Sequence, residues 1–152
     1  VAAVAIGGDD PRSIGLSLAF FALAVVTLQL FIAGFRALTV YDDAEQIAGE
    51  NVAAALSHAG LSLAVAVIVA RAVEGDFVGW AISLKGYGGV LLSALTLYPV
   101  RQVFVQGALL RAPIKLRGGR IDAGIANDRD VGLAALEAAT YLATALSISR
   151  LA

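Results

Sequence analysis

The sequence predicts an all-α membrane protein, a bundle of four transmembrane helices built from two tandem helical hairpins. Three observations lead to this fold class. Hydrophobic residues make up 59% of the chain and charged residues only 15%, which lies outside the usual range of soluble domains. Four long segments are almost free of charge, and the second half of the chain aligns with the first at a fixed offset.

Each of the four apolar segments is long enough to cross the hydrocarbon core of a bilayer, which requires roughly 20 mostly apolar residues. The third segment contains one charged residue, Arg101, and the fourth contains one, Glu137. Because the segments are apolar on every side, they are typical of membrane spans and not of helices buried in a large soluble core. The predicted spans cover residues 13–35, 51–70, 86–110 and 131–149.

The two halves of the chain align without a gap at an offset of 79 residues, so that Asp43 falls on Asp122 and Ala59 on Ala138. Since each half contains two spans, both halves are expected to have the same orientation, as in parallel repeats related by an axis along the membrane normal. The alignment predicts a single integral membrane domain, residues 1–152, made of two helix-hairpin repeats, residues 13–70 and 86–149.

The orientation follows from the distribution of Lys and Arg. Six of the eleven lie in the first and third loops and four on the other side of the predicted membrane. Positive loops tend to stay in the cytoplasm, which places loops 36–50 and 111–130 there and both termini on the periplasmic side. Trp80, in the short external loop, is typical of an interfacial anchor.

Three ionisable side chains lie within the spans: His58, Arg101 and Glu137. Ionisable groups in hydrocarbon usually face a partner or a water-filled cavity, so we expect Arg101 and Glu137 to form an ion pair. His58, equivalent to Glu137 in the repeat, is then the pH-responsive member. The resulting prediction is one intramembrane polar layer in the cytoplasmic half of the bundle, formed by Gln29, His58, Arg101, Gln102, Gln106 and Glu137.

Two interpretations of this polar layer stay open. It can fix the register and partners of the helices, as polar residues between membrane helices often do. It can also form an ion or proton pathway.

Two polar residues precede the second and fourth spans at equivalent positions. Asn51 and Asp130 are predicted helix N-caps, because their side-chain oxygens can accept hydrogen bonds from the free amides of a helix start. Within the same spans, small residues recur at every fourth position, as in Gly60-xxx-Ala64. This spacing allows close helix contact, either between the two spans of one chain or between subunits.

Several classes of site are absent from the sequence. The chain has no Cys and only one His, and one carboxylate within the spans, so no zinc or iron site is predicted. No nucleophile, base and orienting group stand at a recognisable spacing, and no basic arm indicates nucleic-acid binding. The segment Gly86-Tyr-Gly-Gly lacks the Lys and Ser or Thr of a phosphate loop and is expected to be a flexible lead-in to the third span. We therefore expect no catalytic residue, cofactor or metal, and the sequence identifies no small-molecule substrate.

The stretch of residues 41–60 resembles a family signature. An acidic loop is followed by Gly49 and Asn51, then by small residues, and then by Ala59 and Gly60 inside the helix. This pattern resembles the YjfL-like bacterial inner-membrane family, the domain of unknown function three-hundred-and-fifty. In the second copy, Asp130 stands in place of the Asn. The resemblance implies a four-span inner-membrane protein and no known catalytic activity.

The preferred functional prediction is a small non-enzymatic membrane protein that acts as an oligomerising structural or accessory subunit. Its expected partners are the lipid bilayer and either further copies of the chain or a larger membrane complex. The alternative is an ion- or proton-conducting channel subunit that uses His58, Arg101 and Glu137. A third possibility is a docking platform formed by the acidic first loop and the basic third loop, although contact with anionic lipid headgroups is a commoner reason for such charges.

Overall fold

The computed structural model describes residues 11–75 and 77–151, and all regular secondary structure within them is helical. The first ten residues of the predicted domain, residue 76 and residue 152 lie outside the described residues. The prediction of an all-α protein is confirmed for the described residues, and four helical segments are, as predicted, long and apolar enough to cross a membrane. The spans are Ser13–Arg36, Val52–Ala72, Trp80–Leu109 and Val131–Leu151.

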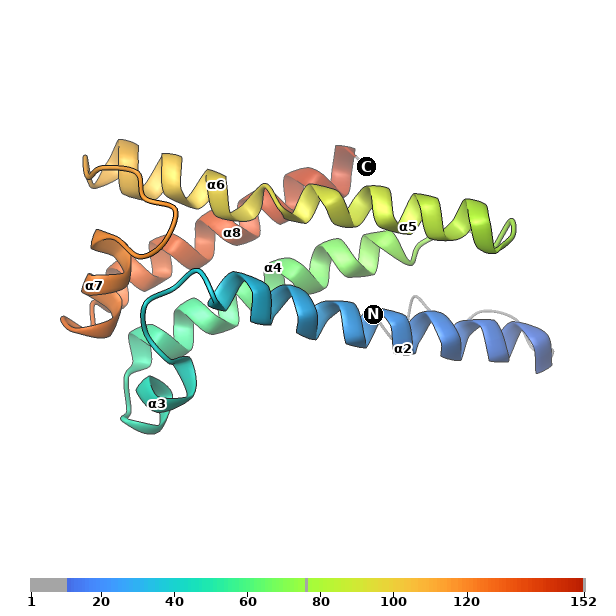
Figure 1. The fold of residues 1–152 in the computed structure, drawn as a ribbon, viewed down its shortest axis with the longest axis horizontal. Coiled ribbons are helices and arrows are strands. Elements are labelled where there is room, and N and C mark those ends of the chain that lie inside the picture. Colours follow the sequence, from blue (N-terminus) through green and yellow to red (C-terminus); the bar gives the residue numbers. More distant parts are fainter. Residues whose placement is uncertain (1–10, 76, 152) are drawn as a thin grey trace.

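Figure 1 shows four long passes that run alternately in opposite directions. The first pass is α2 (Pro11–Arg36) and the second is α4 (Val52–Ala72). The third consists of α5 (Trp80–Ala94), α6 (Leu97–Arg101) and the π-helix η1 (Gln102–Leu109), and the fourth is α8 (Val131–Leu151). Two short helices, α3 (Asp43–Ala48) and α7 (Arg120–Ala126), lie between passes at the same end of the molecule.

The third span begins at Trp80 and not at residue 86 as predicted. Trp80 therefore starts a helix instead of lying in a loop, and the Gly86-Tyr-Gly-Gly segment is helical, so the expected flexible lead-in was wrong. The Trp80 ring stacks on Phe20 at a centroid distance of 5.9 Å and meets Phe77 edge-on at 5.3 Å. These aromatic contacts fix the start of α5 against α2. The exposed Lys85 is accommodated near this end because its long stem can reach the interface.

A break divides the third span after Ala94. Pro99 has no backbone N–H and its ring crowds the preceding turn, so the helix cannot continue unchanged through residues 95–99. Beyond the break, the chain widens into the π-helix η1, a form that is rare and is often found at functional sites. The break and the π-helix together set the direction in which Arg101, Gln102 and Gln106 point.

The helices α4 and α8 form the centre of the bundle. A Cβ atom added at Gly60 would lie 2.3 Å from the Cβ of Ala138, so glycine is required for the two helices to approach this closely. At least one of the small residues predicted to allow close helix contact therefore does so within a single chain, where α4 meets α8. The main buried apolar cluster lies on the C-terminal side of this crossing along both helices. It includes Leu61, Ala64, Val65, Ile68, Leu97 and Ala145.

This crossing generates a prediction about Gly60. The change Gly60→Ala should lower the free energy of unfolding by about 1–3 kcal/mol, because the added methyl group overpacks the α4–α8 contact. Thermal or denaturant unfolding in mild detergent measures this change in the free energy of unfolding. Gly89→Ala is the matched control, since nothing lies within 4 Å of a Cβ added there. Equal stability of the Gly60→Ala protein and the wild type would contradict the close crossing.

Candidate functional site: a buried ionic cluster

A fully buried arginine lies at the centre of the candidate site. Arg101 is the last residue of α6, and its side chain is 0% exposed. Its Nε donates to Oε1 of Glu137 at 2.6 Å, and its Nη2 donates to Oδ1 of Asp122. Both carboxylates are buried, Glu137 in α8 and Asp122 in the first turn of α7. The expected ion pair between Arg101 and Glu137 is therefore present, with a second carboxylate that the sequence analysis did not place there.

The remaining oxygens of the two carboxylates also have partners. Ser57 of α4 donates its hydroxyl to Oε2 of Glu137 at 2.6 Å, and the backbone N–H of Val40 donates to Oδ2 of Asp122 at 3.2 Å. The guanidinium of Arg101 lies 5.3 Å from the centre of the Tyr98 ring. A buried ion pair offsets its desolvation cost only when its other polar atoms are also hydrogen bonded. The cluster meets this requirement for all four carboxylate oxygens. Nη1 of Arg101 does not meet it, because it is buried without a hydrogen-bond partner.

A second polar group lies at the end of α2 and is partly exposed. Nη2 of Arg36 is 2.6 Å from Oδ1 of Asp43, and Nε of Arg36 donates to Nδ1 of His58 at 3.4 Å. Burial raises the pKa of the Asp43 carboxyl above its ordinary value, although the nearby Arg36 and His58 oppose this shift. Nη1 of Arg36 is 3.5 Å from the hydroxyl of Ser57, so Ser57 links this outer group to the buried cluster.

The structure divides the predicted polar layer, and His58 lies in the outer group. Its side chain is 38% exposed and it makes no contact with Glu137. Ser57 occupies the place facing Glu137 instead. Consecutive helical residues point about 100° apart, because an α-helix has 3.6 residues per turn. His58 is therefore next to the residue that faces Glu137, but its own side chain lies on a different side of α4.

The two glutamines of η1 also have a different role from the one predicted. The Nε2 of Gln102 donates to the backbone carbonyl of Lys115 at 2.7 Å, and the Nε2 of Gln106 donates to that of Pro113 at 2.6 Å. They hold the loop that follows η1 and do not contact the ion pair. Gln29 is exposed on the outer side of α2 and lies outside the cluster. Of the predicted layer, only Arg101 and Glu137 come together.

The two predicted caps differ in their surroundings. Oδ1 of Asn51 accepts a hydrogen bond from the N–H of Ala54 at 3.2 Å, and its Nδ2 donates to the carbonyl of Ile125 at 2.8 Å. Oδ1 of Asp130 accepts from the N–H of Leu133 at 2.9 Å. Asn51 is buried and connects α4 to α7, whereas Asp130 is exposed.

Four members of these groups were not predicted from the sequence to belong to a polar site: Arg36, Asp43, Ser57 and Asp122. Asp43 and Asp122 coincide at the 79-residue offset, and each lies near the start of a short helix and pairs with an arginine. This coincidence of two acidic residues next to the spans was the available signal. Ser57 gave no signal, because small hydroxyl residues are common in membrane helices.

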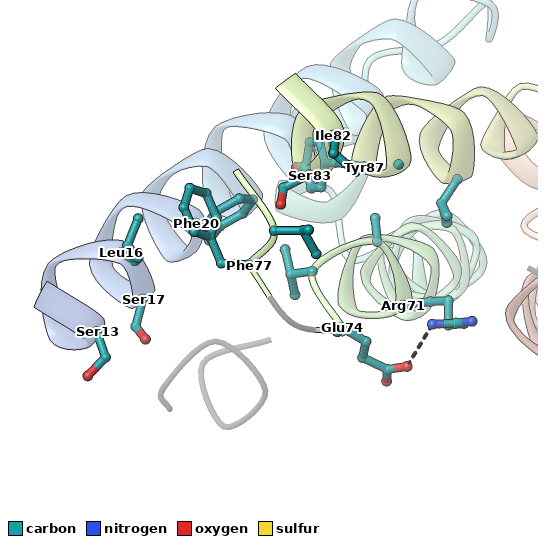
Figure 2. Close-up of a pocket in the computed structure, with 16 residues that line it drawn as sticks. Ser13, Leu16, Ser17, Phe20, Arg71, Glu74, Phe77, Ile82, Ser83 and Tyr87 are labelled. Atoms are coloured by element: carbon teal, nitrogen blue, oxygen red, sulfur yellow. Dashed lines mark hydrogen bonds and ion pairs between the residues drawn. The ribbon is translucent and has the colours of Figure 1, made fainter. Parts of the chain in front are cut away.

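A cavity of about 610 Å³ lies at the opposite end of the molecule, between α2 and the α4–α5 connection. Figure 2 shows its lining, which includes Leu16, Phe20 and Phe77, with the ion pair of Arg71 and Glu74 at its edge, 3.2 Å apart. None of the polar-layer residues lines this cavity. In the described part of the chain, no group of three or more His, Cys, Asp and Glu residues is placed to hold a metal ion.

The family model described as Domain of Unknown Function (DUF350) matches residues 11–151. No curated protein and no solved structure matches the chain.

The buried cluster generates a prediction of strong energetic coupling. Arg101→Leu should lower stability by about 3–5 kcal/mol, because it leaves two buried carboxylates without their cation. Adding Glu137→Gln should recover part of this loss, which unfolding of both single variants and the double variant in detergent will measure. Arg71→Leu is the matched control, since its partly exposed pair with Glu74 should contribute at most about 1 kcal/mol. Additive effects of Arg101→Leu and Glu137→Gln would be incompatible with the cluster.

Proposed function

Since the chain belongs to the DUF350 family, a domain of unknown function, we propose that it acts as a non-enzymatic structural or accessory subunit that associates with further copies of itself. We place it in the bacterial inner membrane, with loops 36–50 and 111–130 in the cytoplasm and the termini on the periplasmic side. The observation that carries the proposal is a polar residue, Gln29, on the exposed face of α2.

The helix α2 is the least covered of the four spans. Its apolar window is 17% buried, against 50% for α4. One row of residues on its exposed face is spaced alternately four and three positions apart, which is the pattern of a coiled-coil seam. Four of the six residues are Gly or Ala, and the other two are one Val and one Gln. Small side chains at such a seam allow two membrane helices to approach closely. The seam consists of Gly15, Ala19, Ala22, Val26, Gln29 and Ala33, all exposed.

Gln29 supplies the reason for a protein partner instead of lipid. It lies seven residues before Arg36 and thus about 10 Å from the end of the span, too deep for its short side chain to reach water. A primary amide both donates and accepts hydrogen bonds. Two copies inserted in the same orientation place their Gln29 side chains at one depth, where they can pair across a two-fold axis.

The tandem-hairpin architecture belongs to this proposal. Its support is the position of α3 and α7 at one end of the molecule and the similar caps, Asn51 and Asp130, that follow them. In this arrangement the ionic cluster fastens one hairpin to the other, because it joins Ser57 of the first to Arg101 and Glu137 of the second. The proposal includes no enzymatic activity, no cofactor, no nucleic acid and no small-molecule substrate.

A second candidate function is conduction of protons or ions. The observation that favours it is a polar line that begins at the partly exposed His58 and its neighbour Asp43. The line continues through Arg36 and Ser57 to Glu137. The buried end of this line has two carboxylates and one guanidinium. Ionisable groups inside a membrane often belong to ion or proton pathways.

Self-association can be tested with Gln29→Leu. The variant should weaken association in bilayers roughly three- to thirtyfold, corresponding to about 0.6–2 kcal/mol for an interhelical hydrogen bond in a membrane. Counting subunits by single-molecule photobleaching at several protein-to-lipid ratios measures this. Leu30→Ala, on the same helix but off the seam, should have a smaller effect. A monomeric wild type, or a Gln29→Leu variant that associates normally, would refute the proposal.

Reconstitution separates the two candidate functions. We expect liposomes that contain the wild-type protein to show no more proton flux than empty liposomes when a pH-sensitive dye is enclosed. Flux that Glu137→Gln abolishes and Glu74→Gln leaves intact would instead assign the conducting function, since Glu74 is an exposed carboxylate remote from the polar line.

A further inference from the structure

The segment that follows η1 folds back along the helix it has just left. The chain turns at Arg111, whose φ of 49° is left-handed, and the N–H of Ala112 donates to the carbonyl of Gln106 at 2.9 Å. Pro113 and Lys115 then present their carbonyls to Gln106 and Gln102. Alternate carbonyls of an extended chain lie about 6.6 Å apart, close to the spacing of side chains one helical turn apart. The two glutamines therefore satisfy the backbone of a non-helical segment at the edge of the membrane, as such a segment requires.

The returning segment leaves its apolar side chains uncovered. Ile114 is 59% exposed and Leu116 is 83% exposed. Between them and the third span lies an apolar groove of about 310 Å³, which includes Pro99 and Val103. Since its wall is a transmembrane helix, the groove faces lipid. It suits part of an acyl chain and not a polar ligand.

The same segment is strongly cationic. Residues 111–120 contain four Lys or Arg residues and no acidic residue, and all four cations are exposed. Cations near a membrane surface attract anionic headgroups, each by a factor of roughly five in affinity. The cationic residues are Arg111, Lys115, Arg117 and Arg120.

We propose that this segment and the groove beneath it form a binding site for one anionic phospholipid. The groove between Val103 and Leu116 takes the acyl chain, and Arg111 and Lys115 hold the phosphate. An apolar groove within the span and a cationic rim at its end together match the two parts of such a lipid. The hydrogen bond from Gln102 to the backbone carbonyl of Lys115 ties the cationic segment to η1 and so keeps it in place above the groove.

Binding of a fluorescent phosphatidylglycerol to the full chain in dodecyl maltoside tests the proposal. We expect unlabelled dioleoylphosphatidylglycerol to displace the probe, and dioleoylphosphatidylcholine or glycerol 3-phosphate to displace it at least tenfold less well. The double variant Arg111→Gln/Lys115→Gln should lose affinity at least tenfold. The control Lys85→Gln/Arg150→Gln, which removes two exposed cations at the other end, should retain it. Leu116→Asn should weaken binding without any change of charge.

Three outcomes would overturn the proposal. Displacement by the choline lipid as strong as that by the glycerol lipid would show that the site does not recognise the headgroup charge. Equally strong displacement by glycerol 3-phosphate would indicate a site for a free phosphate and not for a lipid. A similar loss in both double variants would mean attraction by total charge and no localised site. Circular dichroism and gel filtration confirm that each variant is folded, so that a loss of binding reports on the site.

Discussion

The burial of Arg101 is the constraint on which the rest of the structure depends. Removing a guanidinium from water costs several kcal/mol, and the cost is offset only by carboxylates held in good geometry. Glu137 supplies one from α8, which fixes the depth of α8 beside the third span. Asp122 supplies the other from a segment outside the spans, so α7 must fold back against the bundle. As a result, α7 packs against the bundle and buries two of its apolar side chains, Ile121 and Ile125, which are both 0% exposed.

The two ends of the molecule are held by different interactions. At the end that carries α3 and α7, the ionic cluster, the outer group around Arg36 and the buried Asn51 connect all the passes through hydrogen bonds and charges. At the other end, Phe20, Phe77 and Trp80 form aromatic contacts, and the polar contacts include the ion pair of Arg71 and Glu74. Further along α2, Thr27 accepts a hydrogen bond from Tyr87. Ionic contacts between different passes are therefore concentrated at the end that carries α3 and α7.

The sequence was sufficient for features that depend on local composition. Four apolar lengths predict four spans, and a single Arg and a single Glu within them predict an ion pair, because neither charge is tolerated alone in hydrocarbon. The third span was predicted to begin at residue 86 but begins at Trp80, so that Lys85 lies within it. A lysine near a helix end is tolerated there because its long side chain can extend to the interface.

The features that failed depend on helix rotation and on the path of the loops. Depth along a helix follows from counting residues, but the side to which His58 or Gln29 points depends on how the helices pack. The π-helix turns Gln102 and Gln106 toward a loop that no periodicity predicts. Asp122 is polar and close to other charged residues, which is typical of a solvated loop. Only the position of Arg101 explains its burial.

The most direct test of this account is solid-state NMR of the ¹³C,¹⁵N-labelled protein in lipid bilayers. The account predicts a through-space correlation between the side-chain Nε of Arg101 and the carboxylate carbon of Glu137, together with slow hydrogen exchange of the Arg101 guanidinium. Rapid exchange of that guanidinium with water and the absence of the correlation would show that the buried cluster does not exist.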